Sequence, residues 1–349
     1  MKLATIIGAR PQFIKAATVS RILKDYPSIT EIIIHTGQHY DDNMSKVFFR
    51  QLQIPRPDYD LEVGSASHGK QTGLMLERIE RVLLEEKPDW VLTYGDTNST
   101  IAGALAAVKL HIPTAHVEAG LRSFNRKMPE EINRIATDHV SDLLFVPTQN
   151  AMELLDKEGL SEKAVFSGDV MYDSVLFYSE LLNNTHKPPI LDSIDTYFLA
   201  TIHRPENTDN PQRLQNIFSA FSEVDLPVIL PLHPRTRKLL DGVKYNDNVK
   251  IIDPVGYLQM LYLLKHSSKV LTDSGGLQKE AYFMRKPCLT LRDQSEWVET
   301  LEGNWNFIVA ADKDLILNKI RVGEYGPQTK AFGDGKAAQK IVDRILAEV

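Results

Sequence analysis

The chain has 349 residues, of which 43% are hydrophobic and 25% are charged, and its formal net charge is −6. This length suggests two ordinary domains, and the average composition excludes disordered and fibrous proteins. The acidic balance, 40 Lys+Arg against 46 Asp+Glu, argues against nucleic acid as a partner, because nucleic-acid-binding proteins carry a clustered basic excess. The single cysteine, Cys288, excludes an internal disulfide framework and a multi-thiolate zinc site.

The first elements of the chain are short and apolar. The run at residues 3–7 is too brief for a secretory signal, and Arg10 follows it closely. No stretch approaches the roughly 20 apolar residues that a membrane span needs. We therefore expect a soluble, cytoplasmic protein with no membrane partner.

Strand-like and helical segments alternate through the first half of the chain. The segment from Gln71 to Leu84 has apolar residues at helical spacing and separates two of the strand-like runs. Such alternation predicts βαβ units and a parallel sheet covered by helices on both faces. The expected strands are Leu3–Ile7, Glu31–His35, Trp90–Tyr94, Thr114–Val117 and Leu143–Val146.

The same pattern starts again after Asp169. A helix over 170–182 is expected to connect the halves, and residues 183–189 have the composition of a linker. The expected strands of the second half are Tyr197–Thr201, Pro227–Leu232, Lys250–Ile252, Lys269–Thr272 and Pro287–Leu291. We predict an α/β protein with two Rossmann-like domains, 1–170 and 171–335, facing across a cleft. The last segment, 336–349, is a candidate to return to the first domain.

Ligands of open α/β sheets bind beyond the carboxyl ends of the strands, so the residues after each strand are the candidates for chemistry. Gly8, Arg10 and Lys15 follow the first strand and could hold an anion at a helix N-terminus. On these residues alone, a plain βα turn with two solvated cations is the better interpretation. The segment matches neither the Gly-x-Gly-x-x-Gly fingerprint nor a Walker motif.

Carboxylates follow the next strands. Asp96 comes after the strand that ends at Tyr94, and Glu118 closes an otherwise apolar strand, where an unpaired charge is unexpected. Glu130 and Glu131 open a helix, where the helix dipole already favours acidic residues. Asp96 or Asn98 could merely cap the helix that follows, but a cap needs one such residue and residues 95–99 offer five polar or glycine positions, which favours a functional role. Carboxylates that converge at one sheet edge are the usual equipment for acid/base chemistry.

The second half offers groups suited to an anion. His203 and His233 follow strands, and Ser274-Gly275-Gly276 enters a helix whose backbone N–H groups could hold a diphosphate. Glu280 lies one turn into that helix, at a spacing that suits a ribose diol. Arg292 follows the next strand as a further anion ligand.

Taken together, these segments resemble the non-hydrolysing UDP-N-acetylglucosamine 2-epimerase family. The match covers most of the chain, from Gly8 to about Arg292. The motifs that carry the resemblance are Gly8-x-Arg10-Pro11 with Lys15, Tyr94-Gly95-Asp96-Thr97, His116-Val117-Glu118-Ala119-Gly120-Leu121-Arg122, Pro129-Glu130-Glu131-x-Asn133-Arg134 and Thr272-Asp273-Ser274-Gly275-Gly276.

The resemblance implies a glycosyltransferase-B-like fold, a homodimer, and a reaction that uses neither NAD nor a metal. In the family, UDP leaves by anti elimination as the C2 proton is removed, and it then adds back to a 2-acetamidoglucal. The acid/base carboxylates match Asp96, Glu118 and Glu130, with the adjacent Glu131 as the other choice. The family's residues that assist the leaving diphosphate match Arg10, Lys15 and His203. The UDP and substrate site matches Ser274, Gly275, Gly276, Glu280 and Arg292, with Arg134 and His233 as further candidates.

The substrate stays open at this point. The short loop 123–128 and the segments at 295–299 and 303–306 resemble the subgroup that acts on UDP-2,3-diacetamido-2,3-dideoxyglucuronate. A C6 carboxylate on that sugar would need one more cation, for which Arg122, Arg126 and Lys127 are candidates. A glycosyltransferase, a hydrolysing epimerase and a UDP-sugar-binding module remain as alternatives, because one fold supports many functions.

Overall fold

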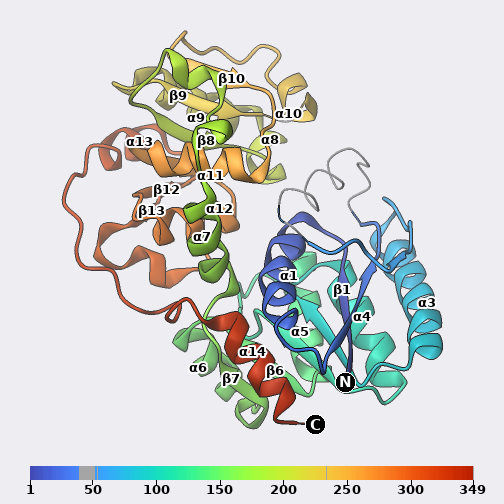
Figure 1. Ribbon diagram of the computed structural model, residues 1–349. Coiled ribbons are helices and arrows are strands. Elements are labelled where there is room, and N and C mark those ends of the chain that lie inside the picture. The colour runs from blue at the N-terminus through green and yellow to red at the C-terminus, as the bar shows by residue number, and fades with distance from the viewer. Residues whose placement is uncertain (39–51, 53, 233, 349) are drawn as a thin grey trace. The chain divides into compact units, whose positions relative to one another are not determined.

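The computed structural model describes residues 1–38, 52, 54–232 and 234–348. The chain divides into two compact units, each of which is described by itself (Figure 1). Unit 1 comprises Met1–Ser174 together with Lys330–Val349, and unit 2 comprises Val175–Thr329. Unit 1 is thus assembled from both ends of the chain.

Unit 1 is built on a parallel sheet. Its strands are β1 (Lys2–Ile7), β2 (Thr30–His35), β3 (Tyr59–Asp60), β4 (Trp90–Tyr94), β5 (Thr114–Val117), β6 (Leu143–Val146) and β7 (Ala164–Phe166). Their spatial order is β3-β2-β1-β4-β5-β6-β7, and every neighbouring pair is parallel. The central strands β4 and β5 are buried along their whole length, as expected where helices cover both faces of a sheet.

The helices of unit 1 pack on this sheet. They are α1 (Arg10–Leu23), α3 (His68–Glu86), α4 (Asn98–Lys109), α5 (Pro129–Val140), α6 (Gln149–Lys157), the first part of α7 (Val170–Leu181) and α14 (Ala337–Leu346). Helix α4 packs between α3 and α5, and α14 packs against α1. Gly103 of α4 allows this helix to lie close to the sheet, since a Cβ atom there would be only 2.7 Å from Ile6 Cδ1 on β1.

Unit 2 repeats the arrangement. Its strands are β8 (Phe198–Thr201), β9 (Val228–Pro231), β10 (Val249–Ile252), β11 (Lys269–Thr272), β12 (Cys288–Thr290) and β13 (Asn306–Ile308). They form a parallel sheet in the order β10-β9-β8-β11-β12-β13. Besides the end of α7, the helices are α8 (Pro205–Thr208), α9 (Pro211–Glu223), α10 (Pro234–Lys238), α11 (Tyr257–His266), α12 (Gly275–Phe283) and α13 (Lys313–Lys319).

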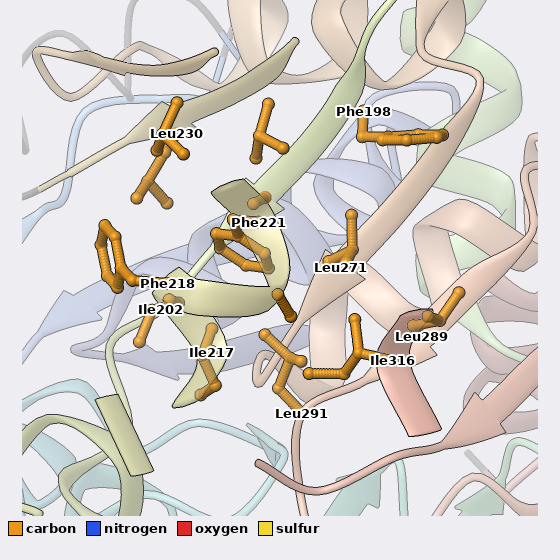
Figure 2. Packing of buried hydrophobic residues seen from close by; sticks show 14 of the residues in the cluster. Phe198, Ile202, Ile217, Phe218, Phe221, Leu230, Leu271, Leu289, Leu291 and Ile316 are labelled. Atoms are coloured by element: carbon orange, nitrogen blue, oxygen red, sulfur yellow. The ribbon is translucent and has the colours of Figure 1, made fainter. Parts of the chain in front are cut away.

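The core of unit 2 lies between its sheet and two helices. Phe218 and Phe221 of α9 and Ile316 of α13 pack with Leu271 and Leu289 of the sheet (Figure 2). Each of these side chains is at most 1% exposed. Burial of one such side chain contributes roughly 1.5–3 kcal/mol, so this face of the sheet is a rigid support for the loops at its edge.

The predicted fold class is confirmed: both units are α/β with parallel sheets. The sequence pattern missed β3, β7 and β13, which have only two or three residues each. Within residues 183–189 the structure has a short 3-10 helix, Asn184–His186, and begins another at Pro189. No helix among the described residues is long and apolar enough to cross a bilayer.

Both sheets change winding direction at one place. In unit 1 this switch point lies between β1 and β4, and in unit 2 it lies between β8 and β11. Loops that leave neighbouring strands in opposite directions there open a crevice in α/β folds. Most of the polar residues singled out by the sequence follow these strands and β5, while His233 follows β9, Arg292 follows β12, and Glu130 and Glu131 open α5.

Candidate active site

The turn after β1 is tightly packed. A Cβ atom at Gly8 would lie 2.0 Å from Thr36 Oγ1 and 2.2 Å from Ser99 Oγ, so only glycine fits. The backbone N–H groups of Gly8 and Ala9 donate to Gln12 Oε1 at 2.8 and 2.9 Å. The Gln12 side chain therefore accepts hydrogen bonds from two backbone N–H groups at the helix N-terminus where the sequence analysis placed a possible anion site.

The two cations predicted after β1, Arg10 and Lys15, have different positions in α1. Arg10 begins α1, but its side chain lies outside what the structure describes. Lys15 lies one turn further along the helix, and its side chain is only 7% exposed. Its ammonium group donates to Glu118 Oε2, and the Glu118 side chain is only 8% exposed. The structure thus brings Lys15 and Glu118 together as a buried ion pair.

The backbone around this pair adopts left-handed conformations. Glu118 has φ +73°, a conformation that costs a non-glycine residue on the order of 1–3 kcal/mol and is found mainly at functional sites. Gly95 has φ +64°, and a Cβ atom there would lie 3.1 Å from Lys15 Nζ. Glycine at position 95 therefore leaves room for the ion pair and permits the turn.

Asp96 is oriented by α5. Arg134 Nη2 donates to Asp96 Oδ2 at 2.5 Å, and the Asn133 side chain donates to the Asp96 carbonyl oxygen at 3.0 Å. The Arg134 side chain is 4% exposed, whereas that of Asp96 is 27% exposed. One face of the Asp96 carboxylate is thus fixed by a buried cation while the side chain still reaches solvent. The helix cap at this position is formed around Thr97 instead.

Glu130 and Glu131 have different surroundings although they are adjacent. Glu131 is 1% exposed, and it accepts hydrogen bonds from Ser123 N at 2.9 Å and Phe124 N at 2.8 Å. Its Oε2 atom also lies 3.4 Å from Arg134 Nη1. Glu130 is partly exposed, and within the described part of the chain its carboxylate has no hydrogen-bond partner. Glu131 holds the 123–128 loop, and Glu130 is available for other chemistry.

Arg122 is not free to bind a sugar carboxylate. Its guanidinium donates to Asp138 at 2.7 Å and to both carboxylate oxygens of Glu158 at 2.7 and 2.8 Å. Burial lowers the pKa of Arg122, but these hydrogen bonds and charges outweigh burial and raise the pKa overall. Of the three cations expected for a C6 carboxylate, the exposed Arg126 and Lys127 remain.

In unit 2, a carboxylate that the sequence analysis did not select organises the end of β8. Asp273 is fully buried and accepts hydrogen bonds from the backbone N–H groups of His203 and Arg204 at 3.0–3.1 Å. It also accepts from Asn207 Nδ2 at 3.1 Å and lies 3.1 Å from His203 Nδ1. Burial raises the pKa of Asp273, but its hydrogen bond and charge interaction with His203, helped by Arg204 N and Asn207, lower the pKa overall. The buried carboxylate thereby fixes His203, whose side chain is 56% exposed.

The Ser-Gly-Gly segment begins α12 as the sequence indicates. Ser274 is the N-cap, and its hydroxyl oxygen accepts from Leu277 N at 3.4 Å. A Cβ atom at Gly275 would lie 3.1 Å from Glu296 Oε1, whereas at Gly276 its nearest neighbour would be 3.9 Å away. Gly275 thus permits the close approach of the segment that follows β12.

Arg292 and Glu280 are both buried near this helix start. The Arg292 side chain is 1% exposed and donates to Glu296 Oε2 at 2.9 Å. Glu280 lies within α12 and is 6% exposed. Lys279 stacks over the Trp297 ring with its ammonium 3.8 Å from the ring centroid, which fixes the 295–297 segment beside Gly275. His233 lies outside the described residues.

The candidate residues thus form two groups. In unit 1, Lys15, Asp96, Glu118 and Arg134 gather around Gly95, and Glu130 lies on α5 one turn before Arg134. In unit 2, Asp273 holds His203. Ser274 and Gly275 begin α12, and Arg292 lies beside Gly275. Within the described ranges, no cluster of three His, Cys, Asp or Glu side chains could hold a metal ion. The sequence missed Asp273, although it stands in the Thr-Asp-Ser segment directly after β11.

Comparison with known proteins gives a consistent result. Residues 21–346 match the family model described as UDP-N-acetylglucosamine 2-epimerase. The UDP-2,3-diacetamido-2,3-dideoxy-D-glucuronate 2-epimerase of Pseudomonas aeruginosa is 53% identical over 352 residues, covering 98% of this chain and 99% of that protein. The UDP-N-acetylglucosamine 2-epimerase of Methanocaldococcus jannaschii is 46% identical over 99% of both chains.

A solved structure agrees over the whole length. The crystal structure of the Methanocaldococcus jannaschii UDP-GlcNAc 2-epimerase, in complex with UDP-GlcNAc and UDP, superposes with a TM-score of 0.93 at 45% sequence identity. The alignment covers 100% of each chain.

Proposed function

The chain belongs to the UDP-N-acetylglucosamine 2-epimerase family, and on this premise we propose that it inverts C2 of a UDP-2-acetamido sugar without hydrolysing it. The first substrate we propose is UDP-N-acetylglucosamine, with UDP-N-acetylmannosamine as the product. The observation that carries the proposal is the group of carboxylates and cations around Gly95 in unit 1.

The chemistry requires a positioned base because a C2 proton beside an acetamido group is only weakly acidic. In the proposed forward step, a carboxylate takes the C2 proton and the C2–H electron pair forms the C1=C2 double bond. The C1–O bond breaks, and its electron pair leaves with the β-phosphate oxygen of UDP. In the second step, the same oxygen attacks C1 and C2 receives a proton on the opposite face. Each general acid or base typically contributes about 10²–10⁴-fold to such a rate.

We assign the acid/base roles to Asp96, Glu118 and Glu130. Two opposite faces of C2 need two proton-transfer groups, and a third can handle the proton at the leaving oxygen. Asp96 and Glu118 are each paired with a cation, Arg134 and Lys15 respectively, which orients the carboxylate. We assign Glu131 to holding the loop 123–128, since both of its oxygens already accept backbone hydrogen bonds.

We assign UDP binding to unit 2. The start of α12 offers backbone N–H groups and the positive end of a helix dipole, which suit a diphosphate. Arg292 adds a buried cation beside Gly275, and His203 adds a donor fixed by Asp273. Cations and helix N-termini stabilise the charge that develops on UDP as it leaves. Glu280 is the candidate for the ribose diol.

A second substrate is favoured by one of the relatives. The Pseudomonas aeruginosa protein, whose name specifies UDP-2,3-diacetamido-2,3-dideoxy-D-glucuronate, is 53% identical to this chain. The same elimination and re-addition would serve that sugar. Its C6 carboxylate would need a cation, and Arg126 and Lys127 on the exposed part of the 123–128 loop are the ones available.

Proton NMR in D₂O tests the reaction and the substrate together. The enzyme is incubated with UDP-N-acetylglucosamine and, separately, with the diacetamido uronate. We expect a manno-configured nucleotide sugar with deuterium at C2 from one of them. Release of free sugar and UDP would contradict a non-hydrolysing reaction, and absence of C2 exchange with both substrates would contradict epimerisation.

Two expectations about the assembled protein accompany this proposal. Membership of the family supports a homodimer that works in the cytoplasm, where nucleotide sugars are made. Sedimentation equilibrium distinguishes the dimer from a monomer, and a monomer at assay concentration would contradict it.

A further inference from the structure

A network of charged side chains in the interior of unit 1 contacts the backbone next to Asp96 and Glu118. His116 on β5 and Asp138 on α5 are both 0% exposed, and His116 Nδ1 lies 2.7 Å from Asp138 Oδ1. The other oxygen of Asp138 accepts from Arg122 at 2.7 Å and from Gly120 N at 3.1 Å. Arg122 in turn forms a two-pronged ion pair with Glu158.

Both ring nitrogens of His116 face acceptors. Nδ1 faces the Asp138 carboxylate, and Nε2 lies 2.6 Å from the carbonyl oxygen of Gly95. Burial raises the pKa of Asp138, but the hydrogen bond and charge of His116 and the charge of Arg122 lower it overall, so the carboxylate is ionised. A carbonyl and a carboxylate cannot donate. Both contacts are hydrogen bonds only if His116 carries a proton on each nitrogen, as an imidazolium.

An imidazolium also balances the charges of the network. Arg122 and His116 then supply two positive charges against the two carboxylates of Asp138 and Glu158. His116, Asp138 and Arg122 are buried, whereas the Glu158 side chain is 28% exposed, so the geometry of the two ring nitrogens carries more weight than this balance.

The network holds the backbone of the two loops that carry the proposed acid/base residues. The Gly95 carbonyl bonded to His116 belongs to the peptide that joins Gly95 to Asp96. The N–H of Gly95 donates to Val117 O at 2.9 Å, next to Glu118. Asp138 accepts a hydrogen bond from the backbone N–H of Gly120, two residues beyond Glu118. This bond fixes the turn that contains Glu118 on its C-terminal side.

We propose that His116, as an imidazolium paired with Asp138, is a positioning residue that fixes Asp96 relative to Glu118. The inference rests on the proposed epimerase function, because it concerns the alignment of the two carboxylates on one sugar carbon. His116 itself is fully buried and acts through the Gly95–Asp96 peptide. A misplacement of about 1 Å in such a constellation can cost about 10²-fold in rate.

Two amide variants separate positioning from a merely structural role. In His116→Gln, the amide nitrogen can reach the place of Nε2 and still donate to the Gly95 carbonyl. In His116→Asn, the amide nitrogen takes the place of Nδ1 and keeps only the bond to Asp138. The two variants carry the same functional group and differ by one methylene.

We expect His116→Asn to lower kcat by about 10²-fold with little change in KM or in UDP affinity. His116→Gln should keep kcat close to the wild-type value. If His116 only stabilised the fold, His116→Asn should retain a higher kcat than His116→Gln, because the asparagine keeps the hydrogen bond to the charged Asp138. Tyr197→Phe serves as the control: it removes a buried hydrogen bond to Leu263 O in unit 2, at 2.7 Å, and should lower Tm without changing kcat.

Equal kcat values in the Asn and Gln variants would overturn the proposal, whether both are normal or both are reduced. A loss of kcat that follows the loss of Tm in all three variants would also overturn it. If the His116 variants do not fold, ¹⁵N NMR of histidine-labelled wild-type protein reads the protonation directly. The His116 signals, identified by their change in Asp138→Asn, should show a proton on both ring nitrogens, and one unprotonated nitrogen would contradict the imidazolium.

The outcome for the proposed function is separate. Absence of C2 exchange by the wild-type enzyme contradicts the epimerase proposal, and with it any reaction for His116 to support. Wild-type exchange combined with equal Asn and Gln variants contradicts the role of His116 alone.

Discussion

At the scale of single residues, Asp96 combines a fixed orientation with access to solvent. Arg134 holds one of its oxygens, while 27% of its side chain is exposed. Asp96→Asn keeps the shape but removes the ability to accept a proton. We expect kcat to fall by about 10²–10⁴-fold while UDP binding, measured by calorimetry, is unchanged.

Asp142→Asn is the matched control for that experiment. Asp142 accepts from Thr114 N at 2.8 Å, at the amino end of β5 and therefore at the opposite edge of the same sheet. An asparagine oxygen can still accept this bond, so activity should remain normal. Normal turnover in Asp96→Asn would remove Asp96 from the chemistry.

Glu130 and Glu131 offer a second comparison at this scale. Glu130→Gln should reduce kcat and leave Tm unchanged, because its carboxylate has no partner among the described residues. Glu131→Gln should lower the free energy of unfolding by about 1–3 kcal/mol, since a buried amide cannot replace both accepting oxygens. Thermal denaturation and initial rates, measured on both variants, check the assignment; the opposite pattern would exchange the two roles.

At the scale of elements, the turn between β1 and α1 shows why some glycines are irreplaceable. In Gly8→Ala, the new methyl group would collide with the buried hydroxyl groups of Thr36 and Ser99. We expect a loss of about 1–3 kcal/mol in the free energy of unfolding, measured by urea denaturation.

Gly73→Ala in α3 provides the contrast. Gly73 is exposed, and nothing lies within 4 Å of a Cβ atom there. Alanine is the better helix former, so this variant should gain about 0.5–1 kcal/mol. Equal effects of the two substitutions would mean that the β1–α1 turn can relax around a methyl group.

Element periodicity was enough to predict the fold class and most strands, because buried parallel strands read as short apolar runs. It could not predict β3 or β13, since two or three residues show no period. The carboxylates Asp96 and Glu118 could also be predicted as candidates, because they directly follow predicted strands. Their partners could not: the pairing of His116 with Asp138 joins residues 22 apart, and only the packing of α5 on the sheet brings them together.

At the scale of the whole molecule, α14 joins the last residues of the chain to unit 1 through Asp173. Its carboxylate accepts from Ala338 N at 2.8 Å, and burial, assisted by the charges of Asp169 and Asp334, raises its pKa from 3.8 to about 6. The folded protein therefore binds this proton more tightly than the unfolded chain does. Asp173 then favours folding below about pH 4, and this contribution is lost as the pH rises to about 6.

Asp173→Asn should consequently stabilise the protein at pH 8, by up to about 3 kcal/mol, because asparagine keeps an acceptor for Ala338 N without the buried charge. The difference from wild type should shrink towards pH 4. Thermal denaturation of both proteins across this range measures the effect. A less stable variant at pH 8 would show that the ionised carboxylate is needed at the junction.

The return of α14 to unit 1 also bears on how the protein is made. Unit 2 is continuous, so all of its residues have been translated before the segment that begins at Lys330. Unit 1 begins first but is completed after unit 2, because α1 can pack against α14, with its buried Ile341, Val342 and Ile345, only once this helix has been synthesised. The half of the protein with the proposed acid/base residues should therefore become protease-resistant only after α14 has been synthesised, later than the half that starts more than 170 residues downstream.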